Sequence, residues 1–222
     1  MPRSIPRGAV LFGWLLAACG GVARSAGSPS VAPATGNGSA LSPAAQARAD
    51  SGRAKFTAAD VHFMSGMIGH HAQAVLMAGW APSHGASSAV RALCERIVVG
   101  QRDEIAFMQR WLRERRLDVP DGDPAHVRMP GMEHPMMPGM LTPDQLDQLD
   151  AARGAEFDRL FLTFMIQHHQ GAITMVATLM DSPGAAQDEY VFKFAADVNA
   201  DQTTEIDRMS LMLDAMPSAK RP

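Results

Sequence analysis

The sequence predicts an all-α protein, a four-helix bundle built from two duplicated helical hairpins. The segment DVHFMSGMIGHHAQAVLMA, which begins at Asp60, returns as DRLFLTFMIQHHQGAITMV from Asp158. A second repeat follows each copy, because Gln, Glu and Met at positions 101, 104 and 108 return at positions 202, 205 and 209. The apolar residues recur every three or four positions, as on one helix face, and no strand-like alternation of useful length occurs. In the first repeat these pairs keep their residue type: Asp60/Asp158, Phe63/Phe161, Met67/Met165, Ile68/Ile166, His70/His168, His71/His169, Ala74/Ala172 and Met77/Met175.

The first residues predict export. Arg3 and Arg7 precede the short apolar run Gly8–Ala18, a signal-peptide pattern that is too short to cross a bilayer as a mature helix. The run ends in LAAC, which resembles the signal box of bacterial lipoproteins. We therefore expect residues 1–18 to be removed and Cys19 to be lipidated, giving a membrane-anchored protein that faces the periplasm. The alternative is ordinary secretion with cleavage nearer Ala26.

The first hairpin is expected at residues 57–116, within a bundle that spans 56–216. Residues 19–55 are rich in Gly, Ser, Ala and Pro and are predicted to be a disordered tether. Thr57 and Asp60 form an N-terminal cap for a helix that ends before Pro82. A second helix is expected from about Ser87 to Arg116. It carries Cys94, the one thiol left after lipidation, which we interpret as buried and inert.

The second hairpin is expected at residues 142–216, followed by a tail of residues 217–222. A proline-rich linker, residues 121–141, has no helical period and separates the two halves. Thr142, Pro143 and Gln145 form a capping box with Pro at the first helical position, so a short helix begins there. The second repeat and a last helix, from about residue 186, complete the bundle.

The paired histidines predict a metal site inside the bundle. Neighbouring residues on a helix diverge by about 100°, so one histidine of each pair should face the bundle centre while the other flanks it. Glu104 and Glu205 lie on otherwise apolar faces of the partner helices. Buried imidazoles and carboxylates need each other or a metal, and a metal-free His–Glu network is the alternative. The predicted ligands in the helices are His70, His71, His168, His169, Met67, Met165, Glu104 and Glu205.

The linker predicts a second group of soft ligands. It places five methionines around one histidine among prolines and glycines that leave no helix in which the methionines would be core residues. Thioether and imidazole ligands suit Cu(I). The alternative is a linker that packs its methionines on the bundle. The predicted ligands here are Met129, Met132, His134, Met136, Met137 and Met140, whereas His62, His84 and His126 have no repeat counterparts and are expected to face solvent.

At the two His-His motifs and the MPGM stretch of residues 137–140, the chain resembles the bacterial domain-of-unknown-function family 305. The resemblance covers about residues 56–216. It implies a ferritin-like four-helix protein that is exported, and it implies copper as a ligand, because some members are associated with periplasmic copper binding. The family has no settled activity.

These observations favour an envelope protein that sequesters or hands on copper, with a copper ion and other envelope copper-handling proteins as partners. Sixteen methionines and eight histidines stand out among 222 residues, and a net charge of −3 lacks the basic excess of a nucleic-acid binder. A metal-free helical interaction or scaffold module is the alternative. A ferritin-like metal oxidase is less favoured, because di-iron bundles need more carboxylates than this pattern supplies, so no enzyme activity is predicted.

Overall fold

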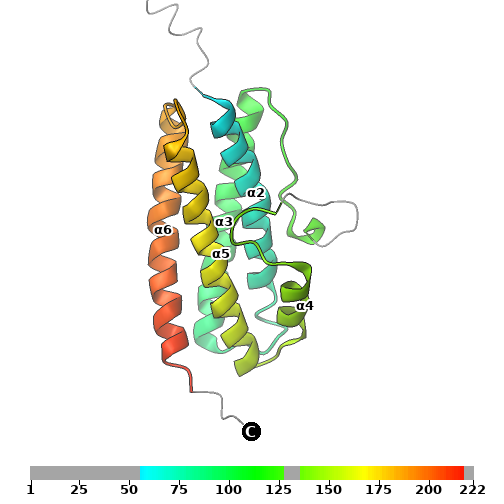
Figure 1. Cartoon of the computed structure of the whole chain (residues 1–222). Coiled ribbons are helices and arrows are strands. Elements are labelled where there is room, and N and C mark those ends of the chain that lie inside the picture. The colour runs from blue at the N-terminus through cyan, green and yellow to red at the C-terminus, as the bar shows by residue number, and fades with distance from the viewer. Residues whose placement is uncertain (1–55, 128–135, 218–222) are drawn as a thin grey trace, which may run out of the picture. The chain divides into compact units, whose positions relative to one another are not determined.

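The computed structural model describes residues 56–127 and 136–217. The chain divides into two units, residues 1–46 and 47–222, and every described residue belongs to the second. The described residues form α2 (Ala58–Gly79), α3 (Ser88–Glu114), a short 3-10 turn η1 (Pro124–His126), α4 (Pro143–Ala151), α5 (Ala155–Asp181) and α6 (Glu189–Asp214) (Figure 1). The predicted all-α fold is confirmed.

Side-chain caps set the helix starts. Thr57 and Asp60 close a capping box at the start of α2, and Thr142 and Gln145 close another at the start of α4. Asp188 accepts hydrogen bonds from the amides of the first turn of α6, so this helix begins at Glu189, slightly later than its apolar pattern indicates. No helix among the described residues is both long enough and apolar enough to cross a membrane.

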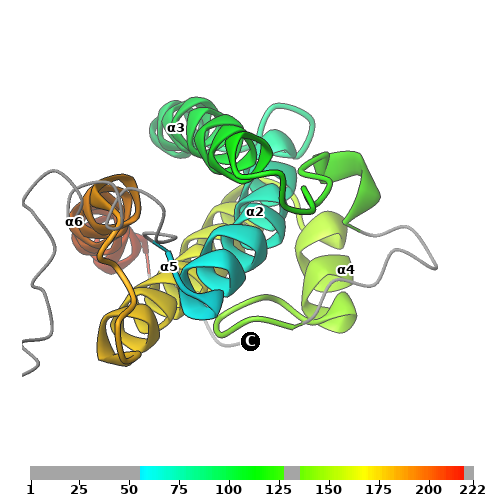
Figure 2. The ribbon, with the colours of Figure 1, turned by 90° about the horizontal axis from the view of Figure 1, so that it is seen from above.

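The two hairpins meet through their first helices. α2 packs along α3, α5 packs along α6, and α2 also packs against α5. Seen from above, α2 and α5 occupy the middle of the bundle, while α3 and α6 lie outside them (Figure 2). The repeated segments that carry the paired histidines are therefore the two central helices.

The apolar core consists of two clusters, and the histidines lie between them. In α5 one cluster holds Phe157 to Met165 and the other holds Ala172 to Leu179. His168 and His169 occupy the interval between these two runs and are completely buried. The bundle therefore encloses a polar layer between two apolar ones.

One sequence interpretation is wrong, because His84 does not face solvent. It is 5% exposed, and its Nε2 lies 2.9 Å from the Asp150 carbonyl and 3.1 Å from Asp150 Oδ1. The cause is tertiary: the chain between α4 and α5 packs on the turn after α2, where Gly154 N donates to His84 O at 2.8 Å. His62 is exposed as expected, and His126 is partly exposed and contacts Asp121.

Candidate metal site

The four histidines of the duplicated pairs converge at the middle of the bundle, and each has 0% exposure. The rings of His70 on α2 and His168 on α5 lie against each other, with centroids 3.8 Å apart. Their neighbours turn away, as adjacent positions on a helix must. The centroids of His70 and His71 are 6.3 Å apart, and those of His168 and His169 are 6.2 Å apart.

His71 and His169, the two histidines that turn away from the central contact, each lie beside the glutamate on the other helix of the same hairpin. His169 Nε2 lies 2.7 Å from Glu205 Oε2 in a hydrogen bond. His71 Nε2 lies 2.8 Å from Glu104 Oε2, close but without the alignment of a hydrogen bond. The glutamate side chains are 23% and 24% exposed. The predicted facing of histidine and glutamate across each hairpin is therefore present in the structure.

Burial keeps the inner histidines neutral. Burial first, and the neighbouring imidazoles second, lower the pKa of His70 to about 3 and the pKa of His168 well below its ordinary 6.5. A neutral imidazole carries one N–H and one lone pair. His70 Nε2 donates to the Pro138 carbonyl at 3.0 Å, so its lone pair is on Nδ1. These side chains are thus in the protonation state that a metal ligand requires.

Several imidazole nitrogens have no hydrogen-bond partner among the described residues. They are both nitrogens of His168, Nδ1 of His70 and of His169, and both nitrogens of His71. A buried polar group left without a partner costs about 1–3 kcal/mol. The cluster therefore contains several imidazole nitrogens that are free of hydrogen bonds to the described residues. Such nitrogens are available to a metal ion that prefers imidazole ligands.

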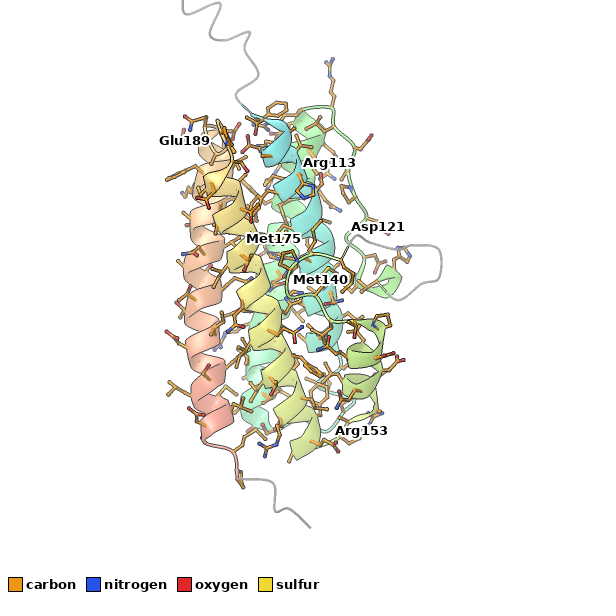
Figure 3. All side chains as sticks on the ribbon, viewed as in Figure 1. Arg113, Asp121, Met140, Arg153, Met175 and Glu189 are labelled. Carbon is orange, nitrogen blue, oxygen red and sulfur yellow. The ribbon has the colours of Figure 1, made fainter. Side chains whose placement is uncertain are left out.

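The end of the linker lies directly on this cluster. Besides the Pro138 contact, the Gln73 side-chain amide exchanges two hydrogen bonds with the Leu141 backbone, at 3.1 and 2.7 Å. Gln167 Nε2 donates to Gly139 O at 3.3 Å. Met140, which is labelled with Met175 in Figure 3, lies on this loop against the central helices. The linker thus carries soft side chains to the histidines.

A cleft of about 210 Å³ leads from the surface toward His70. Met137 and Met140 line it together with His62. The sequence does not mark His62 as a ligand, because its counterpart in the second repeat is Leu160. What indicates a role for His62 is its position at the cleft beside Met137 and Met140, and the sequence alone does not place the linker there. Thioethers and a second imidazole therefore stand at the opening toward the buried cluster.

The other predicted ligands are dispersed. Met67 and Met165 are wholly buried, one in each apolar cluster, and Met136 is 58% exposed. Met129, Met132 and His134 lie outside the described residues. Within the described part of the chain, no three His, Cys, Asp or Glu side chains are arranged closely enough to hold a metal ion as they stand. Binding by this cluster would require its side chains to rearrange.

Comparison with known proteins finds a matching family and several similar solved structures. The model of the DUF305 family, a domain of unknown function, matches residues 60–213. A DUF305 protein from Streptomyces coelicolor, predicted to be secreted, has 26% identity and a TM-score of 0.60, over 73% of this chain and 94% of its own. A DUF305 fragment from Deinococcus radiodurans has 27% identity and a TM-score of 0.60, over 72% and 99%. No curated protein matches.

A third similar structure has a bound metal. The Cu(I)-bound form of CopM has 27% identity and a TM-score of 0.54, over 70% of this chain and 95% of its own. CopM has also been solved in a Cu(II)-bound form, with 28% identity and a TM-score of 0.52. These similar structures share the helical fold of this chain.

Proposed function

The chain belongs to the DUF305 family, and from this premise we propose that it binds copper in the cell envelope, either to sequester the ion or to hand it on. The observation that carries the proposal is the buried cluster of His70, His71, His168 and His169, several of whose nitrogens lack hydrogen-bond partners. Neutral imidazoles with a thioether-lined approach suit copper better than hard cations. The copper-bound forms of CopM support the choice of metal.

We propose a division of labour between the linker and the bundle. Met137 and Met140 at the cleft would take up Cu(I), together with the exposed Met136 and with Met129, Met132 and His134, which lie outside the described residues. The histidine cluster would then hold the ion, with Glu104 and Glu205 orienting His71 and His169. A carboxylate that accepts a hydrogen bond from the N–H of an imidazole makes the other ring nitrogen a better ligand. Met67 and Met165 would be reached only after rearrangement of the core.

The proposed setting is the periplasmic side of a membrane. The signal-peptide pattern and the lipoprotein box at Cys19 support export and a lipid anchor, and the predicted secretion of the Streptomyces relative is consistent with export. Delivery of copper to another envelope protein belongs to the same proposal.

The test is a Cu(I) competition with a chromogenic chelator, on the mature protein under reducing conditions. The double variant His70→Asn and His168→Asn keeps polar side chains in the core, and circular dichroism checks its fold. The matched control is His126→Ala, since this partly exposed histidine is not among the proposed ligands. Copper affinity should fall at least about tenfold in the double variant, as for lost ligand-shell contacts, and stay unchanged in the control.

A metal-free scaffold remains the second candidate, because the hydrogen bond from His169 to Glu205 already pairs one polar couple without an ion. A ligand that binds only the folded state must raise its stability by mass action. If the unfolding temperature does not respond to Cu(I), Cu(II) or Zn(II), the copper proposal fails and the scaffold is favoured. The third alternative, a metal oxidase, would show many turnovers of oxygen per protein in excess Cu(I).

A further inference from the structure

A second cleft is lined by carboxylates and amides, and two of its glutamates contact the histidine cluster. It has a volume of about 340 Å³ and lies between α3 and α6, the two outer helices of the bundle. Glu104 and Gln101 line it from α3, and Glu205, Gln202 and Asp201 line it from α6. The repeat places Gln-x-x-Glu on both walls, as Gln101 with Glu104 and Gln202 with Glu205, whereas Asp201 has no counterpart. No methionine of the described residues lines this cleft, in contrast to the linker cleft at His70.

The carboxylates of this cleft share one electrostatic environment. Burial raises the pKa of Asp201, and the negative charges of Glu104, Glu205 and Asp197 raise it further. Two arginines, Arg96 and Arg208, also line the cleft. Neither forms an ion pair with Glu104, Asp201 or Glu205 among the described residues. Among the described residues, these three carboxylates therefore repel one another with no arginine or lysine paired to them.

The amides give an independent sign that something binds here. Gln101 and Gln202 are each 3% exposed and line the cleft. Within the part of the chain that the structure describes, both side-chain polar atoms of Gln101, and Oε1 of Gln202, have no hydrogen-bond partner. Burying such atoms is unfavourable unless a ligand or water meets them. Carboxylate and amide oxygens together are the ligands that hard, hydrated divalent cations prefer.

We propose that the cleft between α3 and α6 is a port for a hydrated divalent cation. The ion keeps its water shell and docks through it at the carboxylates of Glu104, Asp201 and Glu205 and the amide oxygens of Gln101 and Gln202, because no three His, Cys, Asp or Glu side chains of the described residues are close enough to hold a bare ion. This inference rests on the proposed function in one respect: the cation that passes on to the histidines is Cu2+. Glu104 and Glu205 are the connection, because each lines the cleft and also contacts a wholly buried histidine. The thioether cleft is then the approach for Cu(I), and this one for Cu(II).

The first measurement is the rate of Cu2+ loading by stopped-flow absorbance, with Cu2+ supplied as its glycine complex at about 0.01 M ionic strength, where the Debye length is about 30 Å. Asp201→Asn removes one charge from the port without touching a proposed ligand of the histidine site. Its association rate should fall roughly three- to tenfold, in line with electrostatic steering. The equilibrium affinity of the histidine site for Cu2+ should stay within about twofold, because a port changes the association rate and the dissociation rate by the same factor.

Two controls separate a port from a structural effect. Asp207→Asn removes the same charge from an exposed position of α6 that does not line the cleft, and it should load at the wild-type rate. Gln101→Met replaces a buried amide by an apolar side chain of similar length. It should slow Cu2+ loading without lowering stability in urea, because the amide atoms it removes have no protein partner.

A second measurement does not depend on copper. Mn2+ prefers oxygen ligands and is a poor match for buried imidazoles and thioethers, and its binding is followed by water-proton relaxation. Binding should survive His168→Asn, which alters only the buried cluster, and weaken at least about threefold in Asp201→Asn, as expected when one charge of a carboxylate site is lost. The inference is overturned if Mn2+ does not bind, if Asp201→Asn leaves its binding unchanged, or if Asp201→Asn and Asp207→Asn load Cu2+ equally fast. If Mn2+ behaves as expected but wild-type protein binds no copper, the proposed function fails and the cation port stands.

Discussion

Replacing Gly171 by alanine should lift the linker off the bundle. Gly171 lies on α5 three residues after His168, and its missing side chain leaves room for the backbone of Pro138 and Gly139. A Cβ at this position would overlap the Pro138 carbonyl and stand 2.6 Å from Gly139 Cα. These are backbone atoms, so no side-chain rotation relieves the overlap and the linker itself must move.

The contacts at stake set the magnitude. They are the hydrogen bond from His70 to Pro138 O and the pair between Gln73 and Leu141, each worth about 1 kcal/mol. Alanine regains about 1 kcal/mol over glycine inside a helix. The free energy of unfolding should therefore fall by about 2 kcal/mol, inside the range of about 1–3 kcal/mol typical of overpacked sites.

The matched control is Gly100→Ala. Gly100 lies inside α3, and a Cβ there would meet nothing within 4 Å. The same substitution should thus raise the free energy of unfolding by about 0.5–1 kcal/mol. Urea unfolding followed by circular dichroism measures both variants, so the two are expected to move in opposite directions.

A second readout locates the change. The amide of Leu141, which donates to Gln73 Oε1, should exchange with deuterium faster in Gly171→Ala than in wild type. The reasoning is refuted if Gly171→Ala is as stable as wild type and exchange across residues 137–141 is unchanged, because the linker would then tolerate a side chain that the structure gives no room.

Other predictions follow from the buried polar groups. Burial raises the pKa of the Cys94 thiol to about 12, so iodoacetamide should label it only after unfolding in urea, as peptide mass spectrometry would show. Burial raises the pKa of Asp188, but the hydrogen bond from Arg115 and those from neighbouring donors outweigh it and lower the pKa overall. Asp188→Asn should therefore cost about 1–3 kcal/mol at neutral pH, and the cost should shrink as pH falls below about 4, the unfolded value, and through the folded pKa, measured by urea unfolding across pH. His84→Phe removes the hydrogen bonds to Asp150 and should cost about 1–2 kcal/mol, whereas a solvent-facing histidine would cost nothing.

The helical parts of the site follow from sequence because helix geometry is local. Once the two repeats are placed on helices, the spacing requires one histidine of each pair to face the bundle centre and the other to flank it. The structure gives the flanking place to His71 and His169, which lie 2.8 and 2.7 Å from the glutamates of the neighbouring helix. The contact between His70 and His168 depends on how α2 meets α5. That packing is set by many apolar side chains at once, and no single motif predicts it.

The linker is less predictable, for a physical reason. The linker has no periodic pattern. Its backbone at Gly139, where φ is +77°, packs directly on α5 at Gly171, and this close contact is possible only because Gly171 has no side chain. His84 shows the same limit, because its partner Asp150 is 66 residues away in sequence. Interactions that join distant segments through backbone atoms leave little trace in residue type.

The linker also makes the two histidine pairs unequal, although the sequence duplicates them. His70 donates its Nε2 hydrogen to the Pro138 carbonyl, whereas neither nitrogen of its counterpart His168 has a hydrogen-bond partner among the described residues. Only one linker joins the two hairpins, so only one of the two equivalent positions is covered. An ion that arrives from the Met137 side must use Nδ1 of His70 or displace a carbonyl, while His168, stacked 3.8 Å away, offers either nitrogen. For this reason His168→Asn should weaken copper binding more than His70→Asn, an order that the symmetric sequence alone does not predict.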